Sequence, residues 1–329
     1  MKRRHVLLLF AAARLTHVGA ARAQGAATAR RIAMLSGFAA ADMTGFLDLL
    51  HPELERLGWS PGRDVAWLAP RAAEGRYERL PALAAEIVAE KPDVILVQSA
   101  PATRAAMQAT RTIPIVMVGT GDPVAYGIVA DLRRPGGNVT GSSYLADESA
   151  GKALQVLKEA VPRLASVALP YNAGNEGAAK GLKELGAVAA ALGVRLQALP
   201  VAGPGDFDEM FRLVARERTE AVLLIPEPLL RTHREAIADM ALRHRLPLAI
   251  VGGARYLPAN GLLSYGPTTA QYARITARYV DAILRGANPA VLPVEQPANF
   301  ELGISAKTAK ALGIVIPQSL LLRADEVIQ

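Results

Sequence analysis

The stretch that decides the fold is Ile113 to Gly141, which reads IPIVMVGTGDPVAYGIVADLRRPGGNVTG. Its residues Ile115 to Val118 form a short apolar, β-branched run, typical of a strand buried on both faces of a parallel sheet. The run breaks into a small polar loop, Thr120 to Pro123, and open α/β sheets bind ligands at the carboxyl ends of their strands. Pro135 to Asn138 predicts a turn or crossover before the β-like segment Val139 to Ser143. We interpret the stretch as a ligand loop followed by a passage between two lobes.

Short β-rich runs alternate with amphipathic segments on both sides of this stretch. The predicted strands include residues 31–35, 65–68, 94–97, 166–170, 194–199, 221–225 and 248–251, and the predicted helices include residues 148–160, 176–192 and 269–284. Such alternation is typical of parallel sheets covered by helices on both faces. Because residues 31–141 and 144–262 repeat the same order of elements, we predict an α/β protein with two doubly wound parallel-sheet lobes.

The first 23 residues have the pattern of a secretory signal peptide. Lys2, Arg3 and Arg4 precede the apolar run Val6 to Ala13, and a small-x-small cleavage site ends at Ala23. This segment carries five of the 37 basic residues and none of the 30 acidic ones, so the remaining chain has a net charge of about +2. We therefore expect an exported protein that is soluble in the periplasm.

Composition and motifs argue against several classes of function. The chain contains no cysteine, which excludes disulfides, thiol nucleophiles and thiolate metal sites. No basic stripe with interleaved aromatic residues suggests nucleic-acid binding. The sequence also lacks a dinucleotide fingerprint, a P-loop and a nucleophile elbow. His51, His233 and His244 do not have the spacing of metal ligands. We expect no metal, no cofactor and no catalysis.

Polar residues at the predicted strand ends are the better candidates for a binding site. Hydroxyls and helix-opening amides can hold a carboxylate, and they are available at Ser36, Gly37, Ser99, Thr103, Thr120 and Gly121. Asp122 or Glu227 could then neutralise an ammonium group, so the set suits a zwitterion. Helix caps and turns favour the same residue types, which leaves a purely structural role as the alternative. For Asp122, between Gly121 and Pro123, turn formation is the specific rival.

Five strings of residues together resemble the substrate-binding family of ABC transporters typified by tryptophan-binding lipoprotein-like proteins. They are AEGRYERLPALAAEIV, GDPVAYGIVADLRRPGGNVTG, NGLLSYGP, FELGISAKTAKALGIVIP and LLRADEVIQ. They span nearly the whole chain after the leader. The resemblance implies the type I periplasmic-binding-protein fold, in which three crossings between two lobes form the hinge. It also implies that the loops around Ser36, Ser99 and Asp122 face the cleft from the first lobe, and Asn172, Glu227 and Arg255 from the second.

From the resemblance we expect residues 24–141 and 265–290 in the first lobe, and residues 142–264 and 291–329 in the second. The expected function is that of a periplasmic receptor that binds an amino acid, aromatic or branched, or a related carboxylate, by hinge closure. Its partners would be an ABC permease, contacted directly, and an ATPase, with the receptor itself a monomer. No cysteine follows the cleavage site, which favours a free protein over a lipid-anchored one. A sensory receptor that feeds a membrane protein and an exported α/β enzyme are the alternatives.

Overall fold

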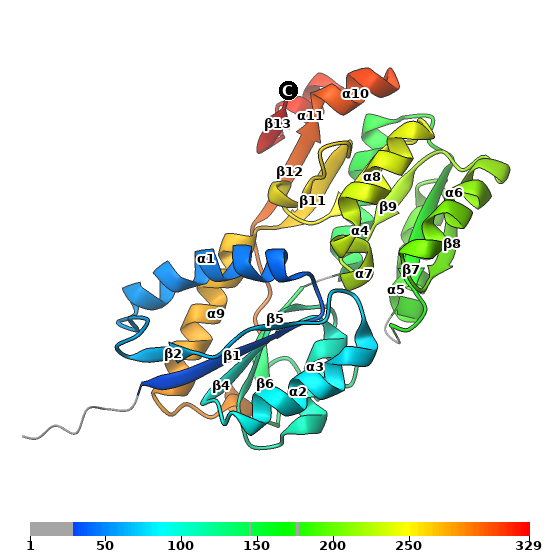
Figure 1. Ribbon diagram of the computed structural model, residues 1–329. Helices are drawn as coiled ribbons and strands as arrows, with labels where there is room; N and C mark the ends of the chain where they lie inside the picture. The colour runs from blue at the N-terminus through cyan, green and yellow to red at the C-terminus, as the bar shows by residue number, and fades with distance from the viewer. Residues whose placement is uncertain (1–28, 145, 176–177) are drawn as a thin grey trace, which may run out of the picture.

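The computed structural model describes residues 29–144, 146–175 and 178–329, and they form two lobes (Figure 1). The predicted signal peptide, residues 1–23, lies outside the described residues. In the part of the chain that the structure describes, no helix is long and apolar enough to cross a membrane.

The first lobe contains a parallel sheet with the strand order β2-β1-β4-β5-β6, and β3 also pairs with β1. Its strands are β1 (Arg30–Ser36), β2 (Val65–Trp67), β3 (Arg71–Ala72), β4 (Val94–Gln98), β5 (Ile115–Thr120) and β6 (Val139–Ser143). Its helices are α1 (Ala40–Arg56), α2 (Leu80–Ala89), α3 (Ala100–Ala109) and α9 (Thr269–Leu284), with short 3-10 turns η1 (Tyr77–Arg79) and η4 (Pro289–Val291). Alternate residues of β1 point to opposite faces, so Ile32 packs under α1 and α9 while Ala33 packs under α2 and α3.

The second lobe contains a sheet with the order β13-β12-β11-β10-β9-β7-β8, in which only the β11–β12 pair is antiparallel. Its strands are β7 (Ser166–Asn172), β8 (Arg195–Val201), β9 (Val222–Leu224), β10 (Leu248–Val251), β11 (Leu263–Pro267), β12 (Phe300–Ser305) and β13 (Glu326–Ile328). Its helices are α4 (Ala146–Ala160), α5 (Ala178–Ala191), α6 (Phe207–Arg216), α7 (Pro228–Thr232), α8 (Arg234–Arg243), α10 (Ala306–Leu312) and α11 (Gln318–Leu321), with 3-10 turns η2 (Pro204–Asp206) and η3 (Ala254–Tyr256).

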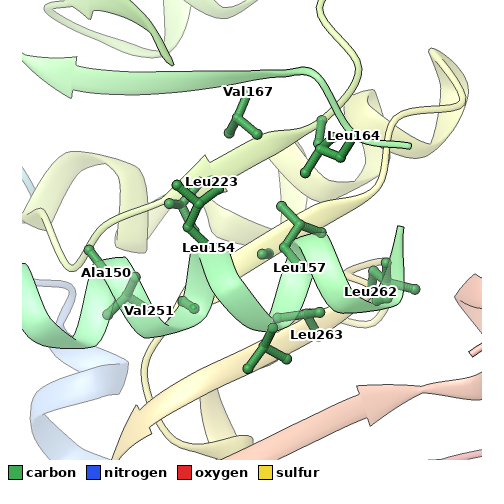
Figure 2. Close-up of a cluster of buried hydrophobic side chains, with 14 of the residues drawn as sticks. Ala150, Leu154, Leu157, Leu164, Val167, Leu223, Val251, Leu262 and Leu263 are labelled. Atoms are coloured by element: carbon green, nitrogen blue, oxygen red, sulfur yellow. The ribbon is translucent and has the colours of Figure 1, made fainter. Parts of the chain in front are cut away.

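Both faces of the second sheet are covered. Leu154 and Leu157 of α4 point toward Leu223 and Leu263 of the sheet, as Figure 2 shows, and all four side chains are fully buried. On the opposite face, side chains of α6 and α8 such as Phe211 pack against β9 and β10. The prediction of two doubly wound α/β lobes is therefore confirmed.

The chain passes between the lobes three times. It leaves the first sheet after Ser143, because the next helix, α4, packs on the second sheet. It returns at Thr268, between β11 of the second sheet and α9 of the first lobe. It crosses again after Glu295, which still pairs with Ser142, and reaches the second sheet at Phe300. These three adjacent segments form the hinge.

The interpretation of Pro135 to Asn138 as a passage between lobes is wrong. β5 and β6 are parallel neighbours in one sheet, with Ile115 opposite Val139. The Asn138 side-chain amide donates to the Ile113 carbonyl at 2.8 Å, and the Asn138 carbonyl accepts from the Ile115 amide at 2.8 Å. The turn is therefore fixed to the first lobe, and the crossing comes after the strand that follows it.

Gly186 lies inside α5, and a Cβ added there would meet no atom within 4 Å. Glycine in a helix interior loses more backbone entropy on folding than alanine does. Gly186→Ala should therefore raise the free energy of unfolding by about 0.5–1 kcal/mol. Urea denaturation measures this increase as a higher midpoint with an unchanged slope. A lower midpoint would show that the added methyl group clashes with its surroundings.

Candidate functional site

The candidate site is a cavity between the two lobes, at the carboxyl ends of strands from both sheets. The first lobe contributes the start of α1, the β4–α3 junction, the end of β5 and the start of α9. The second lobe contributes α7, η3 and the ends of β9 and β10. Aromatic side chains form much of the wall, and they are Phe38, Phe46, Tyr126, Tyr144, Tyr256 and Tyr272.

Arg231 is the one cation among the described residues that line this cavity. It lies on α7, and its guanidinium carbon is 3.3 Å from the centre of the Tyr256 ring and 5.0 Å from that of Phe38. Burial lowers the pKa of Arg231 to about 10, against the opposing effect of Asp42, so the guanidinium remains charged at neutral pH. Its Nε atom is buried and has no hydrogen-bond partner among the described residues.

Asp42 faces Arg231 from the opposite lobe. It lies in the first turn of α1, its side chain is 9% exposed, and its Oδ2 is 3.9 Å from Arg231 Nε. Oδ1 accepts a hydrogen bond of 3.3 Å from Arg234 Nη1, whereas Oδ2 has no hydrogen-bond partner among the described residues. Buried polar atoms are normally hydrogen-bonded. The two residues therefore form a buried ion pair between the lobes in which neither Arg231 Nε nor Asp42 Oδ2 has a hydrogen bond among the described residues.

Glu227 lines the same cavity and is almost completely buried, with 1% of its surface exposed. Its Oε2 accepts a hydrogen bond of 3.0 Å from the Leu230 amide at the start of α7, and its Oε1 accepts one from the Tyr77 hydroxyl of the first lobe. Burial raises the pKa of Glu227 from 4.5 to about 7, against the lowering effect of the Leu230 and Leu229 amides. Burial thus favours the neutral, protonated form of Glu227.

Tyr272 closes the cavity from the start of α9. Burial raises the pKa of its hydroxyl above the ordinary value of 10, and the nearby Arg231 acts in the opposite direction. Its ring lies against Gly119, where β5 is irregular and φ is +61°, and an added Cβ would approach the ring to 3.0 Å. Glycine at this position allows the ring to enter the site.

Two of the nine predicted ligand-binding residues, Ser99 and Glu227, line the cavity. Ser99 is the N-cap of α3, and its backbone has a φ of +88°. Gly37 does not line the cavity but lies beside Ser99. A Cβ at this position would stand 2.5 Å from Ser99 Oγ, so glycine permits the close approach of the two loops.

Three predicted hydroxyls are buried behind the cavity wall and hydrogen-bond within the first lobe. Ser36 Oγ donates to Gln98 Oε1 and accepts from the Phe38 amide, both at 3.1 Å. Thr103 Oγ1 donates to the Ser99 carbonyl at 2.8 Å and lies 3.4 Å from Thr120 Oγ1. These contacts fix the loops that carry Phe38, Gln98 and Ser99 toward the cavity.

The other three predicted residues lie outside the cavity wall. Asp122 Oδ1 accepts from the Val124 and Ala125 amides at 3.0 and 2.9 Å, the contacts of a turn. Asn172 Oδ1 accepts from the Gly174 amide at 2.8 Å and borders an outer groove. Arg255 is exposed, and its Nη2 reaches α1 of the other lobe. A Cβ added at Gly45 of α1 would stand 2.6 Å from this nitrogen.

Sequence reasoning missed Asp42, Arg231, Tyr256 and Tyr272. The sequence contained one signal for Arg231. This residue follows the apolar run Pro228–Leu230, shortly after the buried strand predicted at residues 221–225, and a solvated charge is not expected at such a position. No group of three or more histidine, aspartate or glutamate side chains in the described residues could hold a metal ion.

Two α/β lobes, joined by three crossings and enclosing a charged, aromatic cavity, define a two-lobed solute-binding protein. The chain belongs to the ABC transporter substrate binding protein family, whose profile matches residues 51–328. This is a family of substrate-binding proteins and not of enzymes.

Individual relatives agree with this assignment. A curated tyrosine-binding protein of Clostridioides difficile (strain R20291) is 35% identical over 120 residues, or 36% of this chain, and the match spans about a third, 34%, of that relative. A conserved domain protein from Vibrio cholerae O1 biovar eltor is 27% identical with a TM-score of 0.84, over 91% of this chain and 99% of its own. An ABC domain from Streptococcus pneumonia in complex with L-Trp has the same fold, with a TM-score of 0.84 at 22% identity, over 92% of this chain and 100% of its own.

Proposed function

We propose that this chain is the periplasmic receptor of an ABC importer and binds a free amino acid with an aromatic or branched side chain between its lobes. The observation that carries the proposal is the pair Arg231 and Asp42. Arg231 Nε and Asp42 Oδ2 are buried, opposite in charge and without hydrogen-bond partners among the described residues. A zwitterion supplies the two missing groups, with its carboxylate at Arg231 and its ammonium at Asp42.

The two charges also explain how binding would close the lobes. Asp42 belongs to the first lobe and Arg231 to the second. A ligand that contacts both gains its full set of contacts in the closed form alone, so it shifts the population toward that form. A ligand-free, open substrate binding protein from Clostridium difficile is 20% identical to this chain, over 91% of this chain and 99% of its own. Its TM-score is 0.66, whereas the TM-score to the L-Trp complex is 0.84. The lower score to the open protein supports a hinge motion.

The aromatic wall supports an aromatic or branched side chain on the ligand. Tyr126, Tyr144 and Tyr272 line the cavity, and aromatic rings pack favourably against other apolar and aromatic side chains. The names of two relatives, one tyrosine-binding and one in complex with L-Trp, point to the same class of solute. The closed receptor would then dock on a permease coupled to an ATPase, after export directed by residues 1–23.

A thermal-shift screen tests the proposed function. The panel contains L-tryptophan, L-tyrosine, L-phenylalanine and L-leucine, with N-acetyl-L-tyrosine and L-tyrosine methyl ester as matched controls that lack the ammonium or the carboxylate. A ligand at about 100 times its dissociation constant adds about 2.7 kcal/mol to the free energy of unfolding. We expect a shift with at least one free amino acid and none with either control. Equal shifts with the methyl ester would contradict the role of Arg231.

A further inference from the structure

The contact between Tyr77 and Glu227 crosses from one lobe to the other at the edge of the cavity. Tyr77 lies on η1 of the first lobe and borders two outer grooves, whereas Glu227 lines the inner cavity. The hydrogen bond between their side chains therefore separates the cavity from the grooves. Beside it, Gly75 approaches Leu229 so closely that an added Cβ would stand 2.9 Å from the Leu229 Cα.

Glu227 also sets the position of α7, the helix that carries Arg231. Its carboxylate accepts the Leu230 amide, and its backbone carbonyl accepts the Arg231 amide at 2.9 Å. In Figure 1, α7 lies on the side of the second lobe that faces the first. Moving Glu227 would therefore move Arg231 relative to Asp42.

The burial of Glu227 is not balanced by a cation. Among the described residues no basic side chain forms an ion pair with it, and its partners are a hydroxyl and an amide. The charged groups of the cavity are Arg231 on the same helix and Asp42 on α1. In the groove beyond Tyr77 the charged or titratable groups are Glu74, Arg76, Glu78 and His233. A buried carboxyl group without a cation is stable in its neutral form.

We propose that Glu227 enters the closed cleft as a neutral acid, so that closure of the lobes over the ligand takes up one proton. Glu227 is a positioning residue in this scheme, since it holds α7 and meets Tyr77 but leaves the ligand charges to Arg231 and Asp42. The inference rests on the proposed function for its ligand, and it adds a dependence of affinity on pH.

The direction in which affinity changes with pH follows from the open and closed forms of the protein. In the proposed scheme, opening exposes Glu227 and returns its pKa toward the ordinary value of 4.5, whereas burial in the closed form raises the pKa to about 7. Below the pKa of the open form, Glu227 is protonated in both forms and does not oppose closure. As the pH rises from that pKa to the pKa of the closed form, closure requires the uptake of a proton and becomes weaker, and above the higher pKa it stays weakened. With these values the affinity should fall about 20-fold between about pH 5.5 and about pH 7.5.

Two measurements test the proposal. Isothermal titration calorimetry with L-tyrosine, in buffers of different ionisation enthalpy, gives the affinity and the number of protons taken up at each pH. Nuclear magnetic resonance of glutamate labelled with ¹³C at Cδ follows the titration of Glu227 directly, and the signal is assigned by its loss in Glu227→Gln. We expect proton uptake on binding near pH 6, a Cδ midpoint near 7 in the chain saturated with L-tyrosine, and a flat affinity between about pH 5.5 and 7.5 in Glu227→Gln.

His233 is the matched control, because it is an ionisable side chain that borders the same groove. His233→Asn should keep the pH dependence of the wild-type chain. If Glu227→Gln kept that dependence, or if the Cδ midpoint in the chain saturated with L-tyrosine lay near 4.5, the proposal would be overturned while the proposed function stood. The absence of heat from every amino acid would instead overturn the proposed function, and a Cδ midpoint near 7 in the ligand-free chain would overturn the uptake of a proton on closure.

Discussion

Arg231→Met should weaken the binding of the amino acid by about 30-fold or more, while the fold remains intact. In the proposed complex the Arg231 guanidinium donates to the ligand carboxylate, and removing one partner of such a buried charge pair costs about 2–5 kcal/mol, where each 1.4 kcal/mol is about tenfold in affinity. Methionine is close to arginine in length and is apolar, so it can keep the contacts with Phe38 and Tyr256 that hold the side chain. Calorimetry with L-tyrosine measures the loss, and circular dichroism monitors the fold.

Arg234→Met is the matched control for this prediction. Arg234 also pairs with Asp42, at 3.3 Å, but its side chain is 23% exposed and it does not line the cavity. Solvent screens this partly exposed ion pair more than it screens Arg231, so this variant should lose less affinity than Arg231→Met. Similar losses in both variants would show that the network around Asp42, and not Arg231 itself, carries the binding.

The fold was predictable from the sequence because its signals are local. Strands such as Val94–Gln98 and Ile115–Thr120 are apolar runs, and helices such as Thr269–Leu284 have an apolar stripe at helical spacing. β3 was missed because a strand of two residues carries no periodicity, and β13 because it has only two consecutive apolar residues. The crossing assigned to Pro135–Asn138 failed for a different reason. A turn sequence fixes the local backbone but does not determine which sheet the next strand joins.

The site was less predictable, because it depends on which residues meet across the cleft. The polar strand ends were located correctly, yet Ser36, Thr103 and Thr120 use their hydroxyls within the first lobe. Asp42 and Arg231 lie far apart in the sequence, on helices of different lobes, and face each other at 3.9 Å in the folded chain. Neither residue is unusual in its own helix. Their significance lies in burial and missing partners, which are properties of the three-dimensional structure.

Gly141→Ala should have the largest effect on stability, because the residue stands where β6 leads into the first crossing of the hinge. Its φ is +122°, in the region that favours glycine, and it lies opposite Met117 of β5. A Cβ would stand 2.4 Å from the Met117 carbonyl oxygen and 2.5 Å from the Met117 nitrogen. Both are backbone atoms that no change of rotamer can move. The clash and the strained φ together should cost at least about 3 kcal/mol.

Gly137→Ala provides the comparison, since it changes the same residue type in the turn just before this strand. An added Cβ there meets no atom within 4 Å, and Gly137 does not have a positive φ. The free energy of unfolding should therefore stay within about 0.5 kcal/mol of the wild-type value, as for most surface substitutions. Urea denaturation of the two variants separates the explanations. If both had the wild-type midpoint, β6 could move away from β5 at little cost, and the start of the hinge would be less rigid than the register of these strands indicates.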